Sequence, residues 1–189
     1  MNTVPNIAIT HTFGAGGTSL TQELEKRIPY EKRIVTYDAA RHYLRKNGLN
    51  ANDTNTEQKV ELQLFVIASS IGAVMQSTRS GIMALMDNSL IETIPYCEGL
   101  PIGKDVIDKV YDLLLDYHKH TVSYVIPPTI PLENDGLRHN DKEFRIFVHE
   151  RIMQVIEAFN IPHHILTAQT VEERADEVLH YHKIQHGFF

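Results

Sequence analysis

The chain has 189 residues and a formal net charge of −6 at pH 7, and 42% of its residues are hydrophobic. This length is typical of one domain, and the apolar fraction is too large for a disordered chain. The negative charge argues against a protein that coats nucleic acid, because a large phosphate footprint needs clustered positive charge. A single cysteine, Cys97, excludes an intrachain disulfide framework, and we expect it to be a small buried residue.

The sequence shows no signal for a membrane or for secretion. No apolar run approaches the roughly 20 residues needed to cross a bilayer. The N-terminal residues lack a basic segment followed by a long apolar one. We therefore expect a cytoplasmic protein without a membrane partner.

Predicted strands alternate with predicted helices along the chain. Short apolar and β-branched runs predict five strands, at residues 6–10, 33–37, 82–86, 122–126 and 164–166. Apolar residues spaced three or four apart predict helices over 18–27, from 38 onward, over 54–79, 104–118, 144–159 and 171–182. In the longest helix, the residues expected on one face are Val60, Leu64, Ile67, Ile71 and Val74. This alternation predicts an α/β fold in one domain, residues 1–189, with a five-stranded parallel sheet and helices on both faces.

A glycine-rich turn follows the first predicted strand, where residues 10–20 read THTFGAGGTSL. The glycines let the backbone bend so that successive N–H groups point into one concavity, and the helix that begins near Thr18 adds the positive end of its dipole. We predict that this turn binds phosphate, and a flexible strand-to-helix turn is the alternative. The residues expected to contact a nucleotide are Gly14, Ala15, Gly16, Gly17, Thr18 and Ser19.

The turn is an incomplete Walker A motif, G-x-x-x-x-G-K-[ST]. His11 stands at the position of the first glycine, and Gly17 stands where the motif has lysine. Thr18 keeps the hydroxyl that would reach a magnesium ion. Backbone binding of an anion survives these changes, but the lysine's charge is lost, and we expect nothing inside the loop to replace it. Candidates for a replacement cation from elsewhere are Arg41, Arg79, Lys104 and the arginines of the expected lid.

Acidic residues follow the second and third predicted strands. Asp38 is placed equally well to cap the next helix and to act as the base that deprotonates a substrate hydroxyl. Asp87 follows residues 82–86, which is the position from which an acid holds Mg²⁺ or its water, and a helix cap is again the alternative. Ligands of open parallel sheets bind at the carboxyl ends of the strands, so we expect Thr18 and Asp87 to form a metal site there.

Two arginines accompany a polar stretch that we expect to form a short lid, at about residues 128–145. Arg138 and Arg145 could clamp phosphoryl oxygens in a bidentate manner. The alternative is a solvated surface loop with ordinary salt bridges.

Together these features resemble the P-loop nucleoside- and nucleotide-kinase-like ATPases grouped with the NadR-type kinase domain, the AAA_28-type AAA family ATPases. The resemblance covers nearly the whole chain, through the motifs at residues 7–20, 38–41, 87–96, 124–145 and 171–174. The FGAGG stretch is also similar to the cytidylate-kinase-like group. The chain departs from the family pattern at three positions. His11 and Gly17 stand in place of the first glycine and the lysine of the Walker A motif, and Asn88 stands in place of an arginine.

This resemblance implies a three-layer P-loop NTPase fold and transfer of the γ-phosphoryl group of ATP, with Mg²⁺, to a nucleoside or nucleotide-like molecule. Asp38 would then be the base, and Arg138 and Arg145 would stabilise the transferring phosphoryl group. Two alternatives stay open: a catalytically degenerate protein that binds nucleotide without turnover, and a kinase, as in some phage-encoded relatives, that acts on a modified base in DNA. The net charge makes nucleic acid the less favoured partner, and the helix over 54–79 could serve a homodimer.

Overall fold

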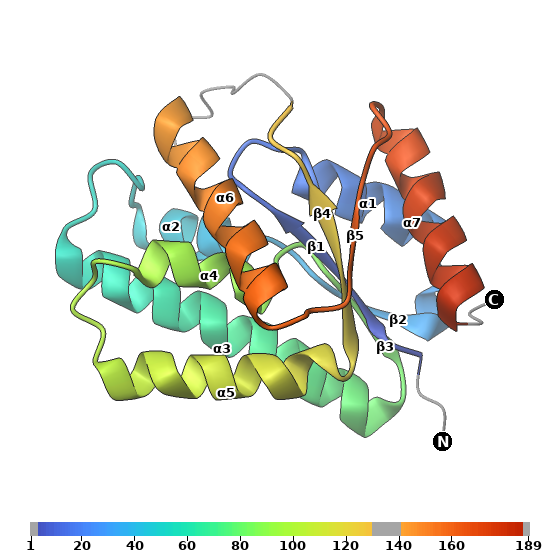
Figure 1. The fold of residues 1–189 in the computed structure, drawn as a ribbon, viewed down its shortest axis with the longest axis horizontal. Helices are drawn as coiled ribbons and strands as arrows, with labels where there is room; N and C mark the ends of the chain where they lie inside the picture. Colours follow the sequence, from blue (N-terminus) through green and yellow to red (C-terminus); the bar gives the residue numbers. More distant parts are fainter. Residues whose placement is uncertain (1–3, 130–140, 187–189) are drawn as a thin grey trace.

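A parallel sheet lies between two layers of helices in the computed structural model, which describes residues 4–129 and 141–186 (Figure 1). The sheet has five strands in the order β2-β3-β1-β4-β5, and every neighbouring pair is parallel. The strands are β1 (Asn6–His11), β2 (Arg33–Thr36), β3 (Met83–Met86), β4 (Thr121–Ile126) and β5 (His163–Ile165). The predicted fold class is confirmed, and each strand boundary lies within about one residue of its prediction.

The helices follow the predicted order with one addition. They are α1 (Gly17–Arg27), α2 (Ala39–Asn47), α3 (Thr56–Ser80), α4 (Leu90–Cys97), α5 (Lys104–His118), α6 (Lys142–Ala158) and α7 (Val171–His186), with a 3₁₀ helix at Tyr30–Lys32. Helix α4 was not predicted, because it is short and contains Pro95, which cannot donate a helical hydrogen bond. Its start is specified by Glu92, whose carboxylate accepts the main-chain N–H of Ser89.

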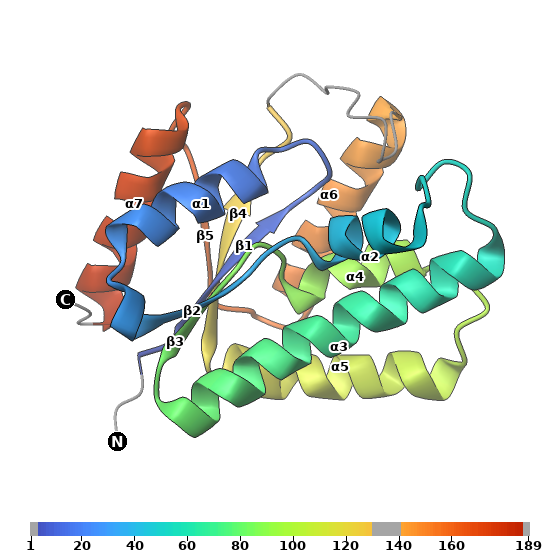
Figure 2. The same cartoon turned by 180° about the vertical axis from the view of Figure 1, so that it is seen from behind.

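Alternate residues of the strands belong to two separate cores, as the period of a strand requires. Ile7 and Ile9 of β1 pack with residues of α1 and α7, whereas Ala8 belongs to the core formed with α3, α4, α5 and α6. Figures 1 and 2 show these two groups of helices on opposite faces of the sheet. The expected burial of Cys97 is confirmed, since it lies in the second of these cores.

Helix α3 is long and apolar enough, by length and composition alone, to cross a membrane, with a mean hydropathy of 1.3 over an 18-residue window. In this fold it packs on α2, α4 and β3. Ile67 of the predicted face is buried and Ile71 and Val74 pack against the core, whereas Leu64 is 42% exposed, so the prediction was wrong at Leu64. Val66 and Ala73, which lie outside the predicted face, are buried. Ser70 and Ser77 are also buried, so small polar residues fill part of a contact that apolar spacing cannot locate.

The strand order brings the ends of β1, β2 and β3 to one edge of the sheet. Strand β3 lies between β1 and β2, and Met86 is in register with both Ala8 and Thr36. The main-chain N–H of Asp87 donates to the carbonyl of Thr36 at 2.9 Å. The glycine-rich turn, Asp38 and Asp87 therefore meet at the carboxyl edge of the sheet.

Candidate functional site

The turn between β1 and α1 has a backbone that suits an anion. Gly14 and Gly16 adopt φ angles of 70° and 88°, a conformation that glycine reaches without a steric penalty. Gly16 is the N-cap of α1, and no side chain caps this helix. The first N–H groups of a helix have no acceptor within it, so this end of α1 is available to a phosphate.

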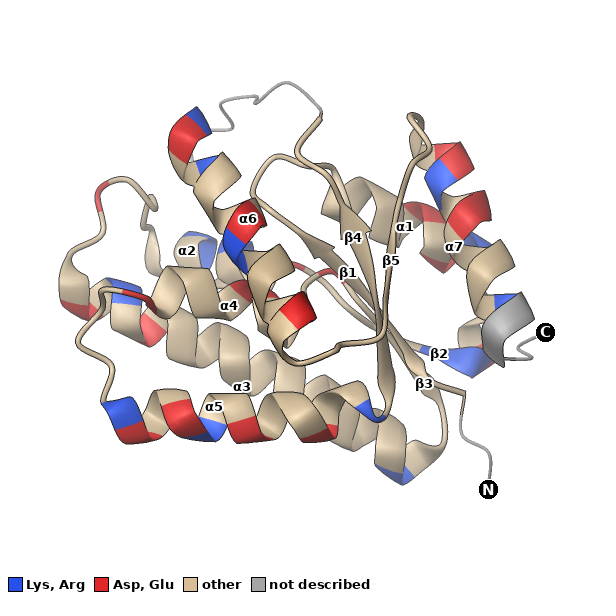
Figure 3. Ribbon diagram, viewed as in Figure 1, with Lys and Arg blue, Asp and Glu red and all other residues tan. Residues whose placement is uncertain are grey.

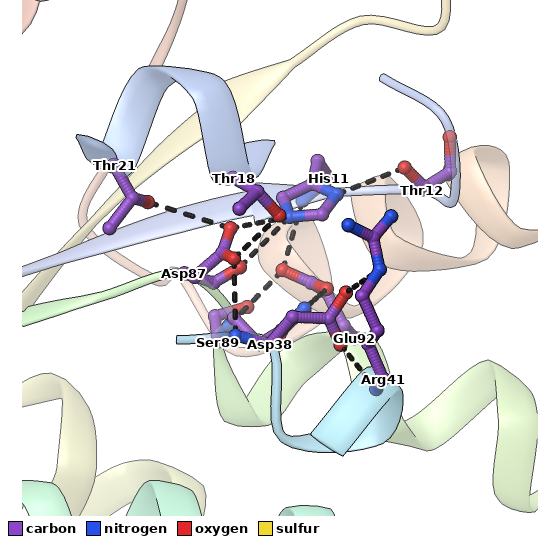
Figure 4. Close-up of polar contacts among 10 residues, drawn as sticks. His11, Thr12, Thr18, Thr21, Asp38, Arg41, Asp87, Ser89 and Glu92 are labelled. Carbon is purple, nitrogen blue, oxygen red and sulfur yellow. Dashed lines mark hydrogen bonds and ion pairs between the residues drawn. The ribbon is translucent and has the colours of Figure 1, made fainter. Parts of the chain in front are cut away.

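The predicted metal pair, Thr18 and Asp87, is brought together at this edge (Figure 4). Thr18 Oγ1 donates to Asp87 Oδ2 at 2.8 Å, and the main-chain N–H of Asp38 donates to the same oxygen at 3.2 Å. Asp87 is fully buried. Hydroxyl and carboxylate oxygens are ligands that Mg²⁺ prefers, so this donor set fits the ion.

His11 lies buried against the other oxygen of Asp87. Its Nε2 is 2.8 Å from the main-chain oxygen of Asp87 and 3.4 Å from Asp87 Oδ1, and its Nδ1 is 2.9 Å from the main-chain oxygen of Thr12. Both nearest partners are carbonyl oxygens, which only accept hydrogen bonds, and this arrangement favours a hydrogen on each ring nitrogen. Burial by itself lowers the pKa of His11, but the negative charges of Glu92 and Asp87 and the hydrogen bonds outweigh it and raise this pKa to about 10.

Glu92 is a site residue to which the sequence interpretation gave no role. Its Oε1 accepts the main-chain N–H groups of His11 at 2.9 Å and of Ser89 at 3.1 Å, and its Oε2 accepts Asn88 Nδ2 at 2.8 Å. Burial raises the pKa of Glu92 to about 7, against the opposing effects of His11 and these donors. The spacing Ser89-x-x-Glu92 is the signal that could have found it, because it is the spacing of a capping box.

Asp38 caps helix α2 and lies close to the metal pair. Its Oδ1 accepts the main-chain N–H of Arg41 at 2.9 Å, and its Oδ2 lies 3.9 Å from Arg41 Nε. The capping role is therefore present in the structure. Asp38 also lines the pocket described below, so the expected role as a base remains compatible with its position.

Arg145 reaches the glycine-rich turn from α6. Its Nε lies 3.4 Å from Thr12 Oγ1, and its Nη2 lies 3.4 Å from the main-chain oxygen of Gly14. It is buried in the first turn of the helix, which Asp141 caps, and this burial lowers its pKa. Arg138 and residues 130–140 of the expected lid lie outside the described part of the chain.

An open pocket adjoins this cluster. Its enclosed volume is about 110 Å³, and the wider space that opens to solvent is about 710 Å³. The lining residues are His11, Phe13, Asp38, Ala40, Leu44, Ala51, Leu62, Gln63, Val66, Asn88, Glu92, Thr93 and Tyr96. Most are apolar, two are acidic, and among the described residues that line the pocket none is lysine or arginine.

The other expected cations are distributed differently. Arg41 lies beside Asp38, whereas Arg79 ends α3 just before β3 begins, at the edge of the sheet opposite to the site. Lys104 is the first residue of α5. Along α5 and the described part of α7 basic residues are interspersed with acidic ones (Figure 3), so neither stretch presents a purely basic stripe to nucleic acid.

Comparison with known proteins agrees with this geometry. The model of the AAA_28 family, an AAA domain, matches residues 6–174. A NadR protein solved in complex with NR superposes with a TM-score of 0.67 and 18% identity, over 99% of this chain and 53% of that one. A thymidylate kinase from Ehrlichia chaffeensis superposes with a TM-score of 0.61 and 15% identity, over 94% of this chain and 97% of that one. The chain thus spans about half the length of the NadR chain, and these likenesses show a shared P-loop kinase-like fold. The chain has no significant match among curated proteins.

Proposed function

Because the chain belongs to the AAA_28 family and has the fold of P-loop nucleotide kinases, we propose that it is an ATP-dependent phosphotransferase acting on a nucleoside or nucleotide-like substrate. The contact between Thr18 and Asp87 carries this proposal, because it lies between an anion-binding turn and a pocket of suitable size. The N–H groups from Gly14 to Thr18 bind the phosphates of ATP. Thr18 and Asp87 hold Mg²⁺, which when bound neutralises charge on the phosphates.

Asp38 and the arginines complete the assignment. Asp38 lines the pocket beside the metal pair, where an acceptor hydroxyl would meet the phosphoryl group, and we assign it the role of base. Arg145 lies against the glycine-rich turn and stabilises the transferring phosphoryl group, together with Arg138. Phosphoryl transfer depends mainly on positioning and charge stabilisation, which these residues supply.

The charge of the pocket favours a neutral acceptor. Asp38 and Glu92 contribute two carboxyl groups and His11 contributes one ring whose pKa is raised, and no lysine or arginine is among the described lining residues to pair with a substrate phosphate. Asn88 stands where the family has arginine. The acceptor is therefore a nucleoside hydroxyl rather than the phosphate of a nucleoside monophosphate.

The test is ADP release with Mg·ATP and a panel of nucleosides and nucleoside monophosphates. In the D38N variant we expect turnover to fall by at least about 100-fold, with ATP binding retained, because asparagine also caps helices well. The matched control is D53N, which changes an exposed aspartate in the loop before α3 and should leave turnover unchanged. Parental turnover in D38N would show that the assigned base is wrong, and no ADP with any acceptor would refute the kinase.

The missing lysine supports a second candidate, a catalytically degenerate protein that holds a nucleotide without turnover. Gly17 and Asn88 both remove a positive charge that the family carries. This candidate requires ATP to raise the melting temperature without any ADP forming. A kinase acting on a base in DNA requires instead a salt-dependent shift on duplex DNA.

A further inference from the structure

Gly17 has no room for a side chain. A Cβ atom built on Gly17 would lie 1.9 Å from His11 Nε2, 2.1 Å from Cδ2 and 2.6 Å from Cε1. Non-bonded heavy atoms prefer separations of about 3.5–4.0 Å, so the ring occupies the space through which a side chain at position 17 would leave the backbone. A Walker A motif carries its lysine at this position.

The His11 ring is fixed where it lies. The residue is 4% exposed, and each ring nitrogen lies within 2.9 Å of a main-chain carbonyl oxygen. Its own main-chain N–H donates to Glu92. The ring cannot swing aside for a larger residue without breaking buried hydrogen bonds, so glycine at position 17 is what this ring requires.

We propose that the His11 ring takes the space of the Walker lysine side chain, so that the two departures from the motif, His11 and Gly17, are one exchange. The ring fills the place through which a side chain at position 17 would leave the backbone. His11 is a positioning residue, because it holds the carbonyl of Asp87 and faces Oδ1, while Thr18 faces Oδ2.

This exchange explains the absence of the lysine side chain by packing, and the expectation that nothing inside the loop replaces its charge remains a prediction. It also changes how the motif should be repaired. G17K alone would drive the lysine stem into the ring, whereas H11G/G17K supplies both missing residues and completes G-x-x-x-x-G-K-[ST]. The packing part of the inference stands by itself, and the part that concerns ATP rests on the proposed function.

The packing part is tested by melting temperatures of wild type, H11G, G17A and H11G/G17A without ligand. Gly17 does not have a positive φ and begins α1, so alanine is otherwise favourable there. We expect G17A to lower the melting temperature by several degrees and H11G/G17A to be at least as stable as H11G. Additive effects, or a further clear loss in H11G/G17A, would overturn the exchange. If G17A does not fold, the comparison of H11G with H11G/G17A still decides.

The part that concerns ATP is tested by calorimetric titration with Mg·ATP. We expect G17K to bind ATP weakly or to unfold, because the lysine stem meets the His11 ring, and H11G/G17K to bind ATP at least tenfold more tightly than G17K. H163Q is the control for loss of a histidine, because His163 lies in β5 and its ring contacts the main chain of Ile161 away from the site. An H11G/G17K variant that binds no better than G17K would overturn the inference. Absence of ATP binding in both wild type and H11G/G17K would refute the proposed function, while the melting temperatures would still decide the packing.

Discussion

Replacing Glu92 with leucine tests how strongly the phosphate-binding turn is tied to helix α4. Leucine would leave the buried main-chain N–H groups of His11 and Ser89 without an acceptor. Each unsatisfied donor costs about 1–3 kcal/mol, so the two together cost about 2–6 kcal/mol. Asn88 is partly exposed and can turn its amide to water, and it adds little. Total stabilities of about 5–15 kcal/mol are typical of domains, so a loss of this size is readily measured.

The assay is urea unfolding at pH 7, followed by circular dichroism, with E92Q as the control. Glutamine keeps one acceptor oxygen for the two main-chain donors. Its new amide hydrogens can meet Asn88 Oδ1, which has no hydrogen-bond partner among the described residues, after the Asn88 amide turns over. We expect E92Q to cost at most about 1.5 kcal/mol, because charged hydrogen bonds become neutral ones. An E92L variant within about 1 kcal/mol of wild type, or equal losses in the two variants, would refute this reasoning.

Three further predictions concern buried basic side chains. The ring nitrogens of His118 are buried without a hydrogen-bond partner among the described residues, so H118L should raise the free energy of unfolding by about 1–2 kcal/mol in urea. Burial lowers the pKa of His118 to about 4, below its ordinary 6.5, so the free energy of unfolding falls as pH falls from 6.5 toward 4. This loss of stability at acid pH should be smaller in H118L than in wild type. The pKa of His11 is raised to about 10, so its contribution to the free energy of unfolding is complete below pH 6.5 and is lost as pH rises through 10. Wild type should therefore lose more stability than H11Q between pH 7 and 10. Equal losses in the two proteins would contradict this prediction. R145K should lower the rate of ADP release by about 100-fold or more, because lysine cannot present a guanidinium fork to the turn. R151K, whose arginine pairs with Glu98 at the end of α4, should release ADP at the wild-type rate.

Strands β1, β3 and β4 were predictable because each is a short, mostly apolar run that ends at a turn or a polar residue, whereas β5, with the sequence HHI, gives a weaker signal. The predicted α3 face was wrong at Leu64 because burial on this helix also falls on serines, to which a hydrophobic pattern assigns no inward preference. Helix α4 was missed because Pro95 interrupts the helical pattern. Its capping interaction was visible in the sequence, but a helix this short has too few residues to show a period.

The proximity of Thr18 and Asp87 was predictable from topology, since the carboxyl ends of parallel strands share one edge. The contacts of His11 were not, because they join residues that are 76 and 81 positions apart and depend on where one ring points. When the sequence is compared with the Walker A motif position by position, His11 and Gly17 count as two independent mismatches. In the proposed exchange a single ring accounts for both, because the atoms that exclude a side chain at position 17 belong to the residue that stands at the first glycine position. A degenerate P-loop should therefore be judged by the space around the lysine position as well as by its letters, since a side chain that enters from another residue can occupy that space.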